Sequence, residues 1–257
     1  MADKLFPQER LEQIMIMVKE RGRVSVIELG ERFGVSTVTI RNDLATLEQQ
    51  GVLMRTHGGA VTKPSAGVTP VFTLRRELCV AEKESIGRAA SELVRDGDAI
   101  ALDDSTTAWH LAQHLKDRHE LTIVTNSLFV AESFLHSPGV TVVMPGGILR
   151  PVSASLVGEQ GDVILERYHV QKGFFGARGF TLAEGLTDPD QYGAELKRRL
   201  VERSKEVIAI VDSTKWGQVT FASFASLKEI DRMITNNAAP ANMVAALRKH
   251  KIKVTIV

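Results

Sequence analysis

The stretch VSVIELGERFGVSTVTIRNDLATLEQQGVLMRTHGGA, residues 24–60, decides the fold of the first part of the chain. It predicts two short helices joined by a tight turn and followed by a two-stranded flap. Ser25 and Glu28 have the spacing of a capping box, so the first helix should begin after Ser25. Gly34 stands where a helix end needs a residue that tolerates a positive φ, and Ser36 is an N-cap for the next helix. Two helices around such a turn are typical of a helix-turn-helix.

The second helix, residues 37–48, has two different faces. Ile40, Leu44 and Leu47 recur at helical spacing and form an apolar stripe. The opposite face carries short hydroxyls, an amide, methyl groups and one arginine, whereas an ordinary exposed face would carry Glu and Lys. These groups suit base edges, thymine methyls and phosphates. The candidate DNA-contacting residues of this helix and its cap are Ser36, Thr37, Val38, Thr39, Arg41, Asn42 and Ala45.

The flap, residues 52–61, alternates briefly between apolar and polar residues and breaks at Gly58 and Gly59. This pattern predicts the wing of a winged helix. From such a wing Arg55 and His57 would reach the DNA backbone or the minor groove. The alternative interpretation of the whole motif is an ordinary small α-hairpin with a polar exterior.

This order of residues resembles the DeoR family of bacterial transcriptional regulators. The resemblance is carried by Val35-Ser36, Thr39-Ile40-Arg41-Asn42-Asp43-Leu44, Leu47-Glu48 and Arg55-Thr56-His57-Gly58-Gly59-Ala60. It implies a winged helix-turn-helix that binds a double-stranded DNA operator. Residues 1–63 hold nine Lys or Arg and eight Asp or Glu, although nucleic-acid binders usually have a basic footprint. The near-neutral module therefore predicts modest affinity per monomer and a homo-oligomer, a dimer or tetramer, on paired sites.

Length and composition predict one small and one larger domain. The chain has 257 residues, a net charge of +1 and 44% hydrophobic residues. We expect a DNA-binding domain at 1–60, a linker at 61–74 and a larger domain at 75–257, with a first helix at 7–21 packing behind the motif. The single Cys79 excludes an internal disulfide. No signal peptide and no apolar run of about 18 residues stand in the sequence, which predicts a cytoplasmic chain with no membrane partner.

The larger domain alternates apolar runs with helical stretches, which predicts an α/β domain with a largely parallel sheet. The expected strands are residues 99–102, 121–124, 140–144, 172–175, 207–211, 233–235 and 253–257. The expected helices are residues 82–95, 107–116, 127–136, 190–204 and 240–250.

Polar residues follow nearly every expected strand. Ligands of open α/β sheets bind outside the carboxyl ends of the strands, so these loops predict a pocket. The hydroxyls of residues 105–107 precede a helix whose N-terminus could hold an anion, with Arg150 and Lys215 as partners. For any single loop, turn or cap residues remain the alternative. The candidate effector-binding residues at these loops are Asp103, Ser105, Thr106, Thr107, Asn126, Gly146, Gly147, Arg150, Gly176 and Lys215.

This second part also resembles the C-terminal sensor domain of the DeoR family, which is similar in fold to ribose-5-phosphate isomerase, glucosamine-6-phosphate deaminase and CoA transferases. The matching pieces are Leu102-Asp103 with Thr106-Thr107, Thr125-Asn126-Ser127, Gly146-Gly147 with Arg150, Gly176-Ala177 with Gly179, Glu195 with Lys197, and Asp212-Ser213 with Lys215. The resemblance implies a pocket for a phosphorylated sugar or related metabolite and adds Lys197 to the effector-binding residues. The family has a small residue and then glycine after the first aspartate. Here Asp104 and Ser105 stand instead and add a negative charge beside the anion loop.

Other motifs give no metal, cofactor or nucleotide site. His110 and His114 lie four residues apart on a helix, but the intervening glutamate of a zinc protease is missing. We expect a solvated or pocket-rim pair. Trp109 and Trp216 lie beside candidate ligand loops, where stacking on a sugar and core packing are both open. No phosphate-binding loop or dinucleotide fingerprint is present.

Two functions from different classes remain. The first is a sequence-specific transcriptional regulator, a repressor of a carbohydrate-utilisation operon, whose effector alters its grip on DNA. The alternative is a sugar-phosphate isomerase or deaminase that carries a DNA-binding-like domain. Catalysis would need a general base, and nothing singles out one of the pocket carboxylates for that role. We therefore assign no catalytic residues and predict that the chain is not an enzyme.

Overall fold

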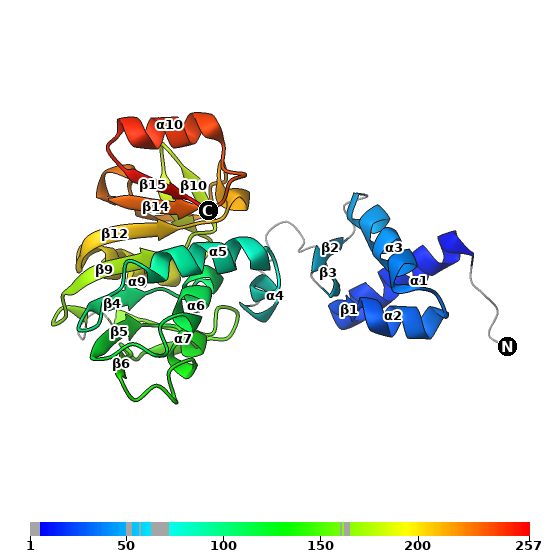
Figure 1. Cartoon of the computed structure of the whole chain (residues 1–257), viewed down its shortest axis with the longest axis horizontal. Helices are drawn as coiled ribbons and strands as arrows, with labels where there is room; N and C mark the ends of the chain where they lie inside the picture. Colours follow the sequence, from blue (N-terminus) through cyan, green and yellow to red (C-terminus); the bar gives the residue numbers. More distant parts are fainter. Residues whose placement is uncertain (1–5, 50–52, 57, 63–71, 160, 162–164) are drawn as a thin grey trace. The chain divides into compact units, whose positions relative to one another are not determined.

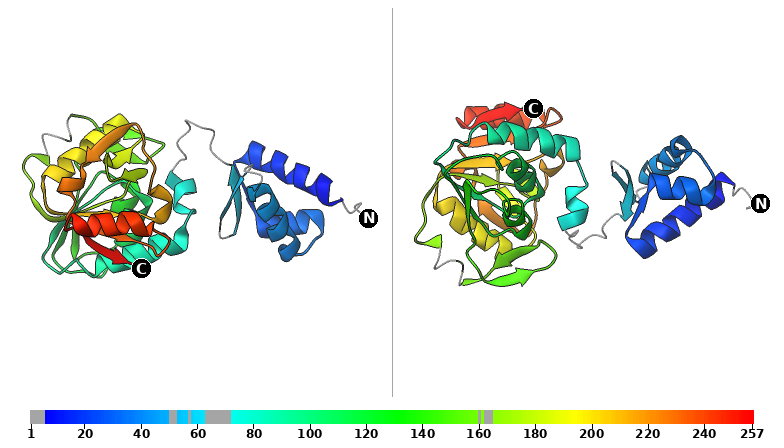
Figure 2. Two further views of the ribbon diagram at one scale, coloured as in Figure 1. Left: turned by 90° about the horizontal axis from the view of Figure 1, so that it is seen from above. Right: turned by 60° about the horizontal axis from the view of Figure 1, so that its bottom comes forward.

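The computed structural model describes residues 6–49, 53–56, 58–62, 72–159, 161 and 165–257. The chain divides into unit 1, Met1–Val80, and unit 2, Ala81–Val257. Most of the linker expected at 61–74 lies outside the described residues. Its last residues begin a short helix, α4 (Phe72–Arg76), which belongs to unit 1. Figures 1 and 2 show the elements of each unit.

Unit 1 contains a helix-turn-helix followed by a wing, so the predicted motif is confirmed (Figure 1). Its elements are α1 (Pro7–Arg21), β1 (Arg23–Ser25), α2 (Val26–Phe33), α3 (Thr37–Gln49), β2 (Leu53–Thr56) and β3 (Gly59–Thr62). The two wing strands are antiparallel and pair Thr56 with Gly59 at their tip. The strand β1 was not expected; it adds to the other edge of β3.

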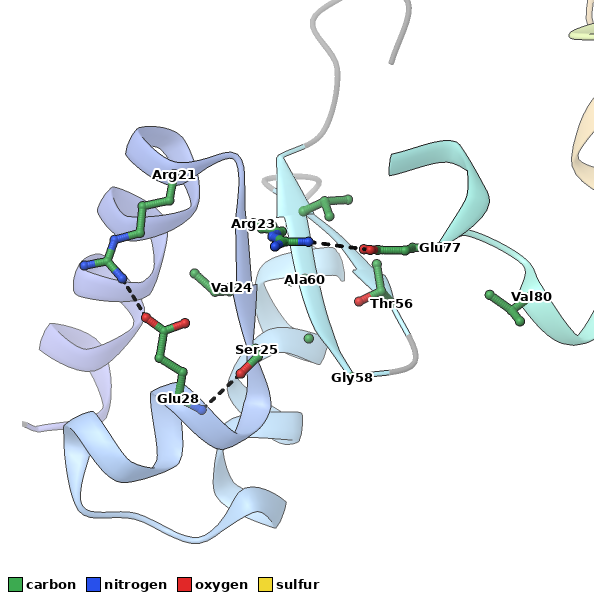
Figure 3. A pocket seen from close by; sticks show the side chains of 12 residues that line it. Arg21, Arg23, Val24, Ser25, Glu28, Thr56, Gly58, Ala60, Glu77 and Val80 are labelled. Carbon is green, nitrogen blue, oxygen red and sulfur yellow. Dashed lines mark hydrogen bonds and ion pairs between the residues drawn. The ribbon is translucent and has the colours of Figure 1, made fainter. Parts of the chain in front are cut away.

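The helix ends form as their sequence predicts. The Ser25 hydroxyl accepts a hydrogen bond from Glu28 N at 3.1 Å, and Gly34 adopts the left-handed conformation at φ 62°. The Glu28 carboxylate, however, accepts from Arg21 Nη1 at 2.6 Å, so the capping box is not completed in the expected way. Both bonds are visible in the close-up of the pocket beside β1 (Figure 3). Ser36 Oγ accepts from Thr39 N at 3.1 Å and caps α3.

One apolar core holds unit 1 together. The stripe of α3 packs against α1 and α2, which removes apolar surface from water and supplies the main stabilisation. Fully or nearly fully buried members are Ile14, Val18, Leu29, Ile40, Leu44, Leu47 and Leu53. Gly59 lies where β3 meets β1, and a Cβ there would collide with the carbonyl oxygen of Val24. The wing is therefore held against the helices.

Unit 2 is built on a parallel sheet of seven strands in the described part of the chain, in the order β15-β14-β12-β9-β4-β5-β6. All seven strands were expected from the apolar runs, and every neighbouring pair is parallel. Their bounds are β4 (Ala99–Leu102), β5 (Leu121–Thr125), β6 (Val140–Val143), β9 (Val170–Phe175), β12 (Ser204–Ile210), β14 (Arg232–Thr235) and β15 (Lys253–Ile256).

Helices cover both faces of this sheet. On one face α5, α6 and α7 pack on Ile100, Leu102 and Ile123. Figure 1 shows these three helices beside the sheet. On the other face α9 packs against β9 and β12, and α10 packs against β15. The helix bounds are α5 (Val80–Ser91), α6 (Thr106–Gln113), α7 (Leu128–Glu132), α9 (Gln191–Glu202) and α10 (Ala241–Lys249). These are the five expected helices, and the predicted α/β class is confirmed.

Two small antiparallel sheets were not expected. One is the hairpin of β7 (Ile148–Arg150) and β8 (Ser155–Val157). The other joins β10 (Gly179–Thr181), β11 (Gly185–Asp188) and β13 (Ala222–Ala225). Both bring loops next to the carboxyl ends of the main strands. Among the described residues, no helix combines the length and the apolar character needed to cross a membrane.

Asp98, just before β4, gives a pH-dependent contribution to stability. Partial burial acts to raise its pKa, but bonds from Lys172 Nζ at 2.7 Å and Arg95 N at 2.9 Å lower the pKa below its ordinary value. Because the pKa of Asp98 is lower in the folded than in the unfolded chain, the ionised carboxylate stabilises the fold. This stabilisation is fully present at pH values above the unfolded pKa, about 3.9, and is lost as the pH falls through the folded pKa. Asp98→Asn should cost about 1–3 kcal/mol at neutral pH.

Urea unfolding of both chains at neutral pH and below the carboxyl pKa measures this effect. The difference between wild type and Asp98→Asn should shrink at the acidic pH. The exposed Glu92, six residues earlier, supplies the control variant Glu92→Gln. An equal difference at both pH values would show that the Asp98 charge contributes nothing.

Candidate nucleic-acid interface and effector site

The outward face of α3 is open within unit 1. Val38 is 61% exposed, and Arg41 and Asn42 are exposed. Within the described part of unit 1, the Arg41 and Asn42 side chains make no hydrogen bond or ion pair with their own protein. Thr39 and Ala45 are half-buried on the flanks of this face. A duplex could therefore meet the residue types that suit base edges and phosphates.

The remaining predicted contacts are placed less uniformly. Ser36 and Thr37 are exposed, but Ser36 Oγ is engaged as the cap of α3 and also lies 2.9 Å from Thr39 Oγ1. Arg55 is exposed on β2. His57 lies outside the described residues.

The acidic residues of unit 1 explain its low net charge. In its described part, four of them are paired with arginines of the same unit: Asp43 with Arg10, Glu28 with Arg21, Glu48 with Arg55 and Glu77 with Arg23. Glu48 Oε1 also accepts from the backbone N of Arg55 at 2.9 Å, which ties the end of α3 to the wing. Several acids are thus turned toward arginines of their own unit, while Arg41 on the outward face of α3 has no ion pair within the described part of unit 1. The sequence shows the acids but not their partners.

In unit 2, Asp103 stands at the centre of the carboxyl edge of the sheet. It is fully buried directly after β4. Its Oδ1 accepts from Ser105 N at 3.1 Å, and its Oδ2 accepts from Gly176 N at 3.0 Å. Burial raises the pKa of Asp103 above its ordinary value despite the nearby Lys197 ammonium. Asp103 therefore joins the ends of two strands.

Lys197 of α9 lies among three carboxylates. Its Nζ is 3.2 Å from Asp103 Oδ2, 3.1 Å from Asp104 Oδ1 and 2.8 Å from Asp188 Oδ2, and its side chain is 3% exposed. Burial acts to lower the pKa of Lys197, but the carboxylates raise it well above the ordinary value. Its hydrogens are directed at carboxylates, so Lys197 orders this edge. The sequence did not indicate a role for Asp188, because the strand that it ends, β11, was not expected.

Asn126 presents a buried acceptor at the same edge. Leu102 and Thr125 pair in register, so Asp103 and Asn126, one residue further on, project from the face covered by α9. Asn126 Nδ2 donates to the Leu156 carbonyl at 3.2 Å, which fixes the orientation of the amide. Its Oδ1 is buried without a hydrogen-bond partner in the described structure. An unpaired buried acceptor is costly, so a ligand donor would be favoured there.

A second unpaired acceptor lies at the end of β12. Asp212 is 1% exposed and its Oδ1 accepts from the amide and hydroxyl of Thr214. Its Oδ2 has no hydrogen bond in the described structure and lies 3.7 Å from Lys215 Nζ. Lys215 also donates to Thr214 Oγ1 at 2.8 Å, and its side chain is 28% exposed. The predicted Lys215 is therefore accessible beside a buried carboxylate.

The predicted anion loop is closely packed. Ser105 Oγ accepts from Ala108 N at 3.0 Å and caps α6, while Thr106 and Thr107 are buried in its first turn. A Cβ on Gly176 would collide with Cβ and Oγ of Ser105. The serine and the glycine thus fit one another across the ends of β4 and β9.

The predicted residues near the β7–β8 hairpin have structural partners. Gly146 and Gly147 have positive φ of 76° and 114°, and a Cβ on Gly147 would collide with the carbonyl of Val157. Arg150 Nη2 donates to Asp190 Oδ1 at 3.0 Å, and the guanidinium lies 5.7 Å from the Tyr192 ring centre. The turn interpretation therefore accounts for the glycines, and Asp190 and Tyr192 engage the Arg150 guanidinium.

We expected a solvated or pocket-rim histidine pair, and the solvated reading is wrong for His110, which is 5% exposed. His110 Nδ1 and His114 Nε2 lie 3.0 and 2.8 Å from the two oxygens of Glu84 on α5. No group of three potential ligands in the described residues has the arrangement of a metal site. Trp216 is 6% exposed and its Nε1 donates to Thr235, so it is a core residue.

Comparison with known proteins decides the family. A model of the DeoR-like helix-turn-helix domain matches residues 10–66, and a model of the DeoR C-terminal sensor domain matches residues 78–237. The chain belongs to the DeoR family of transcriptional regulators. The resemblance seen in the sequence is confirmed over both units of this DeoR-family regulator.

Individual relatives agree with the family models. The chain is 40% identical to the uncharacterized HTH-type transcriptional regulator YulB of Bacillus subtilis, over 97% of this chain and 96% of that protein. It is 31% identical to the glycerol-3-phosphate regulon repressor of Escherichia coli, over 96% and 98%. These relatives are regulators, which decides against the enzyme alternative. A ribose 5-phosphate isomerase from Methanocaldococcus jannaschii matches with TM-score 0.40 and 18% identity, over 52% of this chain and 53% of that one.

The fit between Ser105 and Gly176 can be tested by a double-mutant cycle. Gly176→Ala alone should destabilise by about 1–3 kcal/mol through overpacking. Ser105→Gly alone should cost roughly a few tenths of a kcal/mol, because glycine is an acceptable N-cap. In the double variant the collision is relieved, so its loss should be smaller than that of Gly176→Ala. Urea unfolding of the four chains measures the coupling; purely additive losses would contradict the contact.

Proposed function

We propose that α3 enters the major groove of an operator and reads base edges with its outward face. The observation that carries this proposal is that Arg41 and Asn42 are exposed and make no side-chain hydrogen bond or ion pair among the described residues, on a unit in which several acids are paired with its own arginines. An amide suits adenine and an arginine suits guanine or phosphate. The proposed contacts are Ser36, Thr37, Val38, Thr39, Arg41, Asn42 and Ala45 of α3 and its cap, with Arg55 and His57 of the wing.

The low net charge of unit 1 supports a homo-oligomer on paired half-sites, since one unit supplies few phosphate contacts. The E. coli relative is named as a repressor of a regulon. We propose that this chain is likewise a repressor, that its target is a carbohydrate-utilisation operon, and that it acts in the cytoplasm.

We propose further that the carboxyl edge of the main sheet binds a phosphorylated sugar as effector. Two buried acceptors without a hydrogen bond in the described structure, Asn126 Oδ1 and Asp212 Oδ2, would receive hydrogen bonds from ligand hydroxyls. Lys215 and the first turn of α6 would hold the phosphate. In this proposal Asp103 and Lys197 do not contact the ligand themselves but hold the strand ends of the site in place. The set predicted from the sequence also includes Ser105, Thr106, Thr107, Gly146, Gly147, Arg150 and Gly176.

The reading role of α3 predicts the effect of Asn42→Ala. The loss of one good base contact should weaken operator binding by about 1–3 kcal/mol, while the unfolding midpoint stays the same because Asn42 is exposed. A gel-shift titration with a duplex enriched by the wild-type chain from a random pool measures the affinity. Gln13→Ala, at an exposed position of α1, is the control. Unchanged affinity of the Asn42→Ala chain would remove this face from the interface.

The effector proposal predicts the effect of Lys215→Ala. A panel of aldose and ketose phosphates is first screened by thermal shift, because a ligand of the native state raises its stability. The Lys215→Ala chain should lose the shift and the change in DNA binding, yet bind DNA normally without effector. Lys205→Ala is a matched control, since Lys205 is exposed near the other end of the same strand, β12. A normal response of the Lys215→Ala chain at the same concentration would place the pocket elsewhere.

A further inference from the structure

Arg10 of α1 and Asp43 of α3 form a buried, two-pronged ion pair. Arg10 Nε donates to Asp43 Oδ2 at 2.6 Å, and Arg10 Nη2 donates to Asp43 Oδ1 at 3.1 Å. The two side chains are 8% and 11% exposed. Asp43 directly follows Asn42 in the chain, so the pair acts on the same turn of the helix as the proposed reading residues.

Stability alone is a poor reason for this pair. Two charges must be taken out of water, and exchange of a buried ion pair for well-packed apolar residues is often neutral or stabilising. Apolar contacts already bury α3, because Ile40, Leu44 and Leu47 are fully or almost fully covered. The unit would therefore hold together without the charges.

The ion pair fixes the orientation of α3 relative to α1, which apolar packing alone does not fix. Hydrophobic attraction depends on area and hardly on angle. Two parallel hydrogen bonds from a planar guanidinium fix both the distance and the rotation of the carboxylate. A small rotation or slide of α3 would leave its apolar stripe buried but would move Asn42 and Arg41 away from base edges.

We propose that Arg10 and Asp43 are positioning residues that set the angle of α3, so that selectivity for the operator over other DNA depends on the pair more than stability does. The inference rests on the proposed reading role of α3. Binding to unrelated DNA comes mainly from electrostatic attraction to phosphates, and this attraction changes little over a small displacement. Binding to unrelated DNA should therefore be nearly unaffected when the pair is lost.

The test replaces both charges together in the full chain, as Arg10→Met/Asp43→Leu. The operator probe is the duplex enriched by the wild-type chain, and a scrambled version of it measures nonspecific binding. We expect a wild-type unfolding midpoint and wild-type nonspecific affinity, with the ratio of the two affinities reduced about tenfold or more, as for one lost base contact. The exposed pair Arg21–Glu28 supplies the control Arg21→Gln/Glu28→Gln, which should change neither quantity.

Arg10→Lys keeps the charge but loses the fork, and it carries the test if the apolar pair does not fold. A reduced ratio in that chain supports the positioning role, and a wild-type ratio overturns it. The same holds for the double variant. If Asn42→Ala lowers the ratio and the positioning variants do not, only the positioning role is wrong. If Asn42→Ala also has no effect, the reading role of α3 fails and the positioning role fails with it.

Discussion

The carboxyl edge of the main sheet in unit 2 depends on one ammonium group held among three carboxylates. Lys197 links α9 to Asp103 and Asp104 after β4 and to Asp188 at the end of β11. Asp103 in turn accepts a hydrogen bond from the amide of Gly176, directly after β9. Without the ammonium, the buried carboxylates would repel one another. Removing one partner of a buried ion pair costs more free energy than the intact pair contributes to net stability. The network therefore fixes where the strand ends lie relative to one another.

This fixed edge separates two kinds of polar residue. Asp103, Lys197 and Ser105 satisfy one another and form the frame of the site. Asn126 and Asp212 keep one buried oxygen each without a hydrogen bond in the described structure. The first group holds the strand ends in place, and the second group leaves two buried oxygens able to accept a hydrogen bond. The departure at Asp104 belongs to the frame, because its carboxylate lies 3.1 Å from Lys197 Nζ.

Much of the fold could be predicted because its signals are local. Buried parallel strands are short apolar runs, and Gly22, Ser25 and Gly34 end or begin helices through their own backbone and side chains. The strands β1 and β11 could not be predicted, since three or four residues become a strand only through partners such as β3 and β13, which are distant in the chain. The site shows the same division. Asp103 was found from its place after β4, whereas the role of Asp188 and the unpaired oxygen of Asn126 exist only in the folded chain.

The wing of unit 1 is a braced element. β3 is the middle strand of its small sheet, and Gly59 lets it lie directly against Val24. Glu48 joins the far end of α3 to the amide of Arg55. In the proposed complex, α3 and the described wing strands would meet a duplex already joined to one another, so little conformational entropy would be lost on docking. A preformed shape of this kind lowers the entropic cost of binding to a unit that offers few positive charges.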